Sequence, residues 1–284
     1  MSMRCDCHIH MVLDGSDWKA AIARHSHGPE DTFIHRTLSA YRDAGYTYLR
    51  DGGDRWGVGK QARQLAAQYG IRYRTPLANL CCKGHYGGFI GLNYENPKEF
   101  YALVRQQRAN GADFIKIMIS GLMDFNRFGV LSEEGLPAEL IRELIHIAHE
   151  EGFSVMAHAN GARTMEAAAL AGVDSIEHGA YADGDALQAM AESGTIWVPT
   201  LSAVANLLGK GRFDDGAVSA IAGHTGDNLR TFAALGGCIA CGSDAGAWAV
   251  PHGCGTEENH LRHVLGADAE YILTKGNQAI MDKF

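Results

Sequence analysis

Two histidines near the start of the chain have a spacing that suits metal binding. His8 and His10 end the run of residues 4–10, which we predict to be a strand. Side chains alternate across a strand, so residues two apart project to the same side. Two imidazoles on one side could bind a divalent cation together, or they could form a hydrogen-bonded pair without an ion. The pair alone does not decide between these alternatives.

Four further residues with ligand or proton-transfer chemistry lie within or directly after apolar runs. Lys116 lies in the apolar run of residues 114–119, where an ammonium group is costly to bury unless it is paired or chemically altered. His158 and His178 each end an apolar run, and either one alone could be a hydrogen-bonded core histidine. Asp244 follows residues 238–243 and could instead cap a helix or a turn.

The elements that position these residues follow a repeated pattern. A glycine that can end a helix in the left-handed conformation is followed by an apolar, β-branched run. With residues 4–10 the pattern predicts eight strands, and the segments between them have helical periodicity. Such alternation predicts parallel strands, and eight of them favour a closed (β/α)8 TIM barrel over an open doubly wound sheet. The pattern occurs at Gly45, Gly70, Gly111, Gly152, Gly172, Gly194 and Gly237.

In such a barrel the candidate residues converge. They lie at the carboxyl ends of the first, fourth, fifth, sixth and eighth predicted strands, and these ends meet at one mouth. Imidazole and carboxylate groups suit zinc or a similar divalent ion. The longest irregular segments, residues 81–96, 120–136 and 245–257, each follow a strand and would surround the same mouth. The last helix is expected at roughly residues 258–275.

The composition excludes several classes of partner. The formal net charge is −8, and no stripe rich in lysine or arginine appears, so we expect neither nucleic acid nor a membrane surface as a partner. No run of about 18 apolar residues occurs, and the N-terminal residues lack the apolar stretch of a secretory signal. The seven cysteines do not form a disulfide pattern. We therefore expect a cytoplasmic protein with reduced, packed cysteines.

The candidate residues together resemble the amidohydrolase superfamily of the binuclear metal type. The family pattern is Asp-x-His-x-His on the first strand, a carboxylated Lys on the fourth, His on the fifth and sixth, and Asp on the eighth. Longer matches resemble its branch of imidazolonepropionase-like and prolidase-like dipeptidases, namely residues 47–53, 114–121, 171–179, 197–201 and 242–253. We expect a single barrel domain over residues 1–284, which departs from the family pattern because most relatives also carry a small β-sandwich.

The resemblance also assigns roles. It implies one ion held by His8, His10, Lys116 and Asp244, and a second held by Lys116, His158 and His178, with a CO2-derived carbamate on Lys116 as the bridge. The expected metal is zinc, with manganese or iron as alternatives. The same resemblance makes a metal-bound hydroxide the nucleophile and Asp244 the general base and acid. Residues expected to orient the ligands are Asp6, Arg50 and Asp51.

Substrate contacts are expected from the loops. Residues 81–89 resemble a Gly-Gly-His-Gly loop of the relatives whose histidine faces the substrate, so His85 is the expected catalytic contact and Tyr86 the alternative. Arg127, Arg163 and His252 are weaker candidates for lining the mouth. Asn160 stands where close relatives often have a second histidine, so their substrates do not transfer directly.

The predicted function is hydrolysis of an amide bond in a dipeptide, an N-acyl amino acid or a cyclic amide. A lactonase or a deaminase on the same site stays open, as does a lyase or decarboxylase. A metal-binding barrel without turnover is the alternative from another class, although a structural site has no use for a base such as Asp244. The expected partner is a small-molecule substrate, and a homo-oligomer remains compatible with a barrel of this size.

Overall fold

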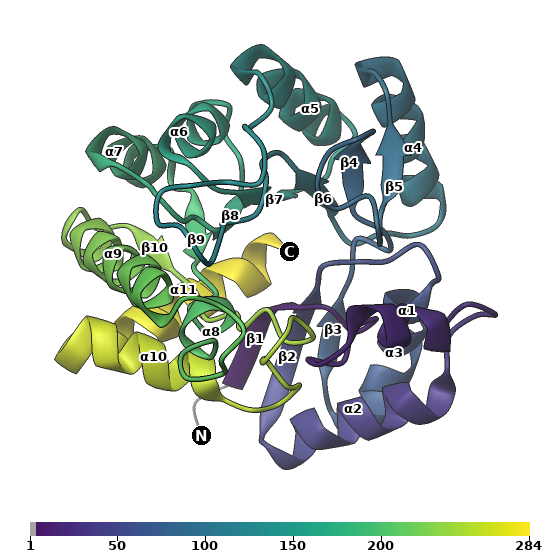
Figure 1. Cartoon of the computed structure of the whole chain (residues 1–284). Helices are drawn as coiled ribbons and strands as arrows, with labels where there is room; N and C mark the ends of the chain where they lie inside the picture. Colours follow the sequence, from purple (N-terminus) through teal and green to yellow (C-terminus); the bar gives the residue numbers. More distant parts are fainter. Residues whose placement is uncertain (1–3) are drawn as a thin grey trace.

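Helices and strands alternate along most of the chain in the computed structural model (Figure 1). The structure describes residues 4–284. Residues 1–3, with which the predicted domain and N-terminal segment begin, lie outside the described residues. The strands are β1 (Arg4–Ile9), β2 (Tyr46–Asp51), β3 (Arg72–Arg74), β4 (Leu80–Cys82), β5 (Leu92–Tyr94), β6 (Ile115–Met118), β7 (Val155–Ala159), β8 (Ser175–His178), β9 (Ile196–Val198) and β10 (Cys238–Ile239). The α-helices are α1 (Trp18–Arg24), α2 (Asp31–Asp43), α3 (Val58–Ala66), α4 (Pro97–Ala109), α5 (Ala138–Glu150), α6 (Ala162–Leu170), α7 (Gly184–Ser193), α8 (Ser202–Ala205), α9 (Asp215–Ala234), α10 (Thr256–Leu265) and α11 (Ala269–Lys283).

The strands form two sheets in which every pairing is parallel, so the predicted α/β class with parallel strands is confirmed. One sheet has the order β1-β2-β3 and the other the order β10-β9-β8-β7-β6-β4-β5. Backbone hydrogen bonds join β1 to the segment after β10, because Cys7 N–H donates to Cys241 O at 2.8 Å and His10 N–H donates to Ala245 O at 2.7 Å. Figure 1 shows the strands arranged around a common centre with helices outside them.

Two predicted elements differ from the structure. The third predicted strand ends at Arg74, since Pro76 has no N–H to donate and Leu77 has a positive φ of 66°. The chain pairs again as β4 and β5, so the predicted irregular segment of residues 81–96 contains ordered strand. The last predicted helix is two helices, because Gly266 adopts φ 65° and ψ −138°, a conformation that only glycine enters readily.

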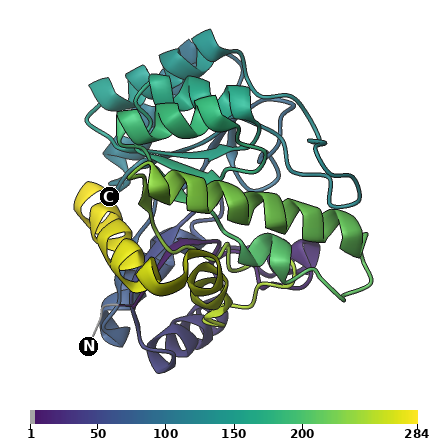
Figure 2. The same ribbon diagram turned by 90° about the vertical axis from the view of Figure 1, so that its left-hand side faces the viewer.

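Helix packing holds the strand ends in place. Helix α5 packs one apolar face inward, where Ile141, Leu144, Ile145 and Ala148 are buried. Helix α11 contacts β10 so closely that a Cβ on Gly276 would lie 1.8 Å from Ile239 O. The long segments after β6 and α8 lie on one side of the molecule, and the C-terminus lies on the opposite side (Figure 2).

The described residues carry neither a disulfide bond nor a bilayer-spanning helix. No disulfide joins any cysteine within residues 4–284. Within the same residues, no helix combines the length and the apolar character that crossing a membrane needs.

Candidate metal centre

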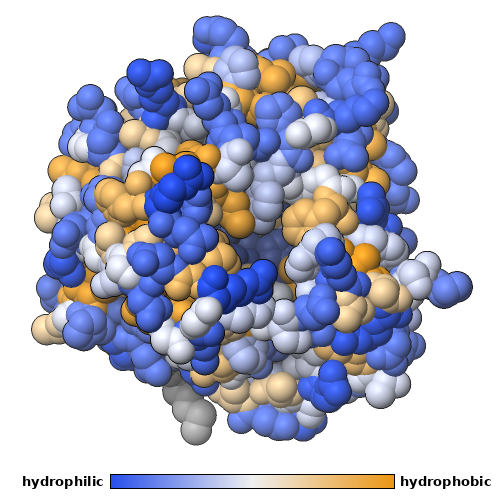
Figure 3. All heavy atoms as spheres, viewed as in Figure 1, coloured by the Kyte–Doolittle hydropathy of each residue, from blue (hydrophilic) through white to orange (hydrophobic). Residues whose placement is uncertain are grey.

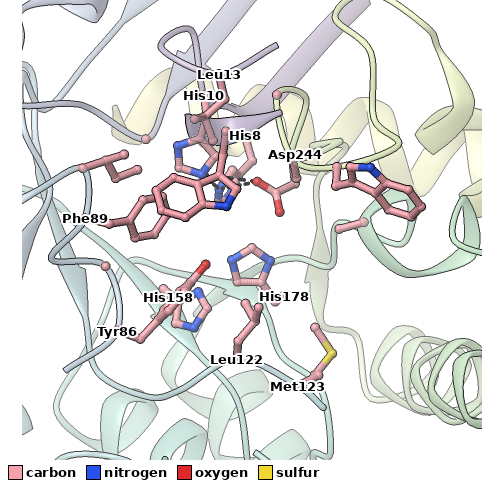
Figure 4. A pocket seen from close by; sticks show the side chains of 18 of the residues that line it. His8, His10, Leu13, Tyr86, Phe89, Leu122, Met123, His158, His178 and Asp244 are labelled. Atoms are coloured by element: carbon pink, nitrogen blue, oxygen red, sulfur yellow. Dashed lines mark hydrogen bonds and ion pairs between the residues drawn. The ribbon is translucent and has the colours of Figure 1, made fainter. Parts of the chain in front are cut away.

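A cavity of about 460 Å³ opens where the strands end. Its face of the molecule is hollowed, and apolar side chains gather around the hollow (Figure 3). The structure brings all six predicted metal-site residues to this cavity, from β1, β6, β7, β8 and the segment after β10. They are His8, His10, Lys116, His158, His178 and Asp244, five of which are labelled in Figure 4.

Three of these residues have the geometry of a cation site. Nε2 of His8 lies 3.4 Å from Nε2 of His10, and Asp244 Oδ1 lies 3.6 Å from the first and 3.2 Å from the second. Two ligand atoms about 2.1 Å from one ion at a tetrahedral angle are about 3.4 Å apart. Asp244 Oδ1 is buried without a hydrogen bond of normal geometry. A divalent cation between the three atoms would satisfy all of them.

Three of the four histidines, His8, His158 and His178, have one ring nitrogen with a hydrogen-bond partner. His8 Nδ1 lies 2.6 Å from Glu177 Oε2, and His158 Nε2 lies 3.2 Å from Gly121 O. A carboxylate and a carbonyl only accept, so both ring nitrogens donate, and the second nitrogen of each ring keeps a free lone pair. His178 Nδ1 lies 2.7 Å from Thr200 Oγ1, which orients the third ring.

Burial keeps these histidines neutral. It lowers the pKa of His8 and of His178 well below the usual range, and it lowers the pKa of His158 to about 3. Nearby positive groups, Lys116 among them, act in the same direction. Metal ligation requires the neutral imidazole, so the rings are already in the binding form at neutral pH.

Glu177 is a residue of the site that the sequence reasoning missed. Its carboxylate contacts His8 through Oε2, and its Oε1 accepts from Arg50 Nη2 at 2.8 Å and from Ser175 Oγ at 2.6 Å. Both Glu177 and Arg50 are completely buried. Lys116 was identified because it is a charged residue within an apolar run. Glu177 is likewise a charged residue within the apolar strand β8, so the same signal could have identified it.

The residues predicted to orient the ligands make the following contacts. Arg50 reaches His8 only through Glu177, and its Nε donates to Cys7 O at 2.7 Å. Asp6 accepts from Ser243 N–H at 2.8 Å and from Ser243 Oγ at 2.6 Å, which fixes the turn before Asp244. Asp51 Oδ1 accepts from Met11 N–H at 3.1 Å, and its Oδ2 accepts from Thr75 Oγ1 at 3.0 Å.

Lys116 is a buried amine without a hydrogen-bond partner. Within residues 4–284 no carboxylate lies at ion-pair distance from its Nζ, so the structural salt bridge considered from the sequence is not formed there. Burial lowers the pKa of Lys116 to about 8, although Glu177 and Asp244 oppose the shift. Lys116 therefore loses its proton more readily than an exposed lysine, and a minor share of the side chain is the neutral, nucleophilic amine near neutral pH.

The backbone at the site adopts conformations that non-glycine residues rarely enter. φ is 67° at His178, 51° at Thr200 and 61° at Asp244. Space is equally restricted, because a Cβ on Gly52 would lie 2.4 Å from Cε1 of His10. The surrounding strands thus hold the site in a strained and closely packed arrangement.

Two neighbouring loop residues differ in orientation. The His85 side chain is 39% exposed, and its Nδ1 lies 3.5 Å from Glu133 Oε1. Tyr86 lines the cavity, and its ring centroid lies 5.0 Å from that of His158. Burial, and to a smaller extent the charge of Asp244, raises the pKa of Tyr86, so its hydroxyl is protonated at neutral pH.

The other predicted contacts lie away from the cavity lining. Arg127 pairs with Asp124, Arg163 is exposed near the start of α6, and His252 bonds the Tyr41 hydroxyl and the carbonyl oxygen of Leu13. Their roles in substrate binding remain predictions.

A different arginine, Arg212, lines the cavity. Its guanidinium lies 4.6 Å from the Trp248 ring centroid and 5.3 Å from that of Phe213. Nothing in residues 207–214 distinguishes this arginine by sequence. The remaining wall of the cavity is mainly apolar and includes Trp18, Phe89, Leu122, Met123, Phe125, Leu207, Phe213 and Trp248.

The sequence of the chain is similar to those of known proteins. A model of the amidohydrolase family matches residues 6–224. Ochratoxinase of Aspergillus niger is 26% identical over 236 residues, which cover 70% of this chain and 47% of that protein, so the chain spans about half the length of this curated relative. An uncharacterized protein of Mycobacterium tuberculosis is 29% identical over 127 residues, 45% of this chain and 33% of that protein.

Solved structures share the fold over nearly the whole chain. A Xaa-Pro dipeptidase with bound methionine in its active site has a TM-score of 0.80 at 24% identity, covering 99% of this chain and 76% of that one. A putative prolidase from Bifidobacterium longum has a TM-score of 0.76 at 23% identity, covering 99% and 70%. Ochratoxinase of A. niger has a TM-score of 0.74 at 21% identity, also covering 99% and 70%.

Proposed function

Because the chain belongs to the amidohydrolase family, as the sequence predicted, we propose that it is a metal-dependent hydrolase that cleaves the amide bond of a dipeptide or an N-acyl amino acid. The observation that carries this proposal is the placement of six ligand-type residues on one cavity, with His8, His10 and Asp244 at the mutual distances of atoms around one cation.

The residues present fit two divalent ions. His8, His10 and Asp244 would hold one ion, and His158 and His178 the other, with a carbamate on Lys116 shared between them. The buried, unpartnered amine of Lys116 supports the carbamate, because carboxylation would turn an isolated basic group into an anion facing cations. Zinc is the expected metal, with manganese or iron as alternatives. Bound ions of this kind polarise a carbonyl and lower the pKa of water.

Asp244 is the proposed proton carrier. Its side chain is 12% exposed and lies on the cavity wall beside His10. A carboxylate in this position would accept the proton of the attacking water and deliver it to the nitrogen that leaves. The turn fixed by Asp6 and Ser243 would hold Asp244 in place for both transfers.

The walls of the cavity favour a substrate with a large apolar group and a carboxylate. Trp18, Phe89, Phe125 and Trp248 would enclose an aromatic or branched side chain. Arg212 would pair with the carboxylate at the outer edge. The relatives named for acting on ochratoxin and on Xaa-Pro dipeptides support amide substrates of this kind.

We further propose that the two sheets are parts of one closed (β/α)8 barrel. The backbone bonds between β1 and the segment after β10 supply one junction. At the other, β3 pairs with β2 while β4 pairs with β6, so the two short strands would be halves of one interrupted barrel strand.

The test is turnover by the purified chain loaded with zinc or manganese in bicarbonate. N-acyl amino acids and dipeptides with a C-terminal phenylalanine, leucine, proline or glycine are compared, with lactones as the alternative substrates. Hydrolysis that is fastest for the apolar amides and lost on chelation supports the proposal. The Asp244→Asn variant should retain most of its metal and lose turnover. Hydrolysis of lactones alone, or full activity of Asp244→Asn, would contradict it.

A further inference from the structure

The glycine-rich loop after β4 presents two polar side chains to different surroundings. His85 faces Glu133 at the edge of the molecule, and Tyr86 faces the cavity. Building on the hydrolase function proposed above, we propose that the Tyr86 hydroxyl, and not His85, donates a hydrogen bond to the oxygen of the scissile carbonyl.

The placement of Tyr86 is the first argument. Its ring centroid lies 5.0 Å from the ring of His158 and 6.0 Å from the ring of Phe89. The side chain thus spans from a metal-site histidine to the apolar wall. Figure 4 shows Tyr86 reaching into the cavity beside His158. The Tyr86 hydroxyl could therefore donate a hydrogen bond to substrate atoms that lie between the metal site and the apolar wall.

The hydrogen-bonding state of the hydroxyl is the second argument. Within residues 4–284, no side chain or backbone group is bonded to the Tyr86 hydroxyl. The hydroxyls of Tyr41 and Tyr69 are bonded to histidines, at 3.0 Å to His252 and 2.6 Å to His35. Those of Tyr48, Tyr73, Tyr94 and Tyr181 also lack a partner, but among the tyrosines of residues 4–284 only Tyr86 lines the cavity. The Tyr86 donor is therefore unused by the protein and available to a ligand.

The third argument is that the loop is fixed before a substrate arrives. Glu133 Oε1 accepts the backbone N–H of Tyr86 at 2.7 Å. At Gly87, φ is 101° and a Cβ would lie 2.6 Å from Met118 Cγ, so only glycine lets the loop approach β6 this closely. Asn79 Nδ2 donates to the carbonyl oxygen of Gly87 at 3.3 Å. A donor held in advance stabilises the oxyanion without reorganisation, and such a donor contributes about 10²–10³-fold to kcat.

Glu133 also explains why the histidine is directed away. The same Oε1 that accepts the Tyr86 backbone N–H lies 3.5 Å from His85 Nδ1. Turning His85 into the cavity would give up this contact.

The experiment compares Tyr86→Phe and His85→Asn in the full-length, metal-loaded protein, with Tyr181→Phe as the matched control. Tyr181 also has a buried hydroxyl without a partner but does not line the cavity. We expect Tyr86→Phe to lower kcat about 10²–10³-fold with KM nearly unchanged and with wild-type metal content. His85→Asn and Tyr181→Phe should stay within about 5-fold of the wild type, well below the loss expected for an oxyanion donor.

Calorimetry separates this role from a merely structural one. A phosphinate analogue of N-acetyl-phenylalanyl-phenylalanine mimics the oxyanion, so Tyr86→Phe should weaken its binding by about the same factor as kcat. Binding of the product phenylalanine should change little. Equal affinity of wild type and Tyr86→Phe for the phosphinate, or a large loss of kcat in His85→Asn alone, would overturn the role of Tyr86. Tyr86-dependent phosphinate binding without amide turnover by the wild type would reject only the proposed function.

Discussion

Replacing Glu177 by glutamine tests whether a buried carboxylate determines which ring nitrogen of His8 carries the proton. The wild-type carboxylate accepts three hydrogen bonds, from His8 Nδ1, Arg50 Nη2 and Ser175 Oγ. Glutamine has nearly the same shape but replaces one acceptor oxygen with an NH2 donor. If this NH2 group faces Arg50, it meets the guanidinium N–H groups, and no hydrogen bond forms between two donors. If it faces His8, the imidazole must move its proton to Nε2, the atom 3.4 Å from Nε2 of His10.

The expected magnitudes follow from complete burial of the pair. Both Glu177 and Arg50 are 0% exposed, so losing the carboxylate leaves a buried guanidinium without its counter-charge. Breaking such a pair costs about 3–5 kcal/mol, a large part of the 5–15 kcal/mol that stabilises a typical domain. Loss of an outer carboxylate partner of a ligating histidine lowers metal affinity about 10–100-fold.

Two measurements separate these effects. Urea unfolding of the metal-free protein reports the lost stability, and competition with a zinc-binding dye reports the affinity. Ser175→Ala is the matched control, because it keeps the Glu177–Arg50 charge pair and removes two hydrogen bonds, one to Glu177 and one from Arg50 Nη1 at 2.9 Å. It should cost less stability, about 1–3 kcal/mol. A Glu177→Gln protein that unfolds at the wild-type urea concentration and binds zinc equally tightly would refute the reasoning.

Three further predictions address other parts of the molecule. Gly52→Ala should displace the His10 ring, since the new Cβ would lie 2.4 Å from its Cε1, and elemental analysis should find less bound metal in a protein that still folds. Lys116→Ala should also lower the metal content, and wild-type content with bicarbonate present would argue against a carbamate ligand. Burial lowers the pKa of His252 to about 4, against about 6.5 when unfolded, so the unfolded chain binds more protons between these values and stability falls as pH drops through this window. His252→Asn should reduce this loss of urea resistance between pH 7 and 4.5, whereas an unchanged pH dependence would show that other groups cause it.

The sequence predicted the parts of the site that depend on residue type at a strand end. A polar residue that directly follows an apolar run is expected at the carboxyl end of a parallel strand. This rule identified His8, His158, His178 and Asp244, all of which line the cavity. Thr200 was missed, and the buried acid Glu177 was overlooked; the contacts of both cross between strands, where spacing along the chain carries no information. That they reach His178 and His8 follows only from the folded arrangement of the strands.

Loop geometry was less accessible to sequence reasoning. The resemblance favoured His85, but whether it or Tyr86 faces inward depends on Glu133, 47 residues away from Tyr86. The third predicted strand was expected to lead into an irregular segment at residues 81–96, whereas the chain is interrupted at Pro76 and Leu77 and then pairs again as β4 and β5. A proline marks a disrupted ladder, yet it does not indicate where the chain pairs again.

The left-handed backbone at His178, Thr200 and Asp244 bears on how this protein would respond to directed evolution. Each such residue costs about 1–3 kcal/mol relative to a relaxed conformation. A campaign that selects only for heat resistance would favour glycine at these positions, since glycine relieves the conformational penalty. Since His178 and Asp244 are proposed metal ligands, we expect glycine at either position to reduce turnover, so a useful screen must score turnover and melting temperature together.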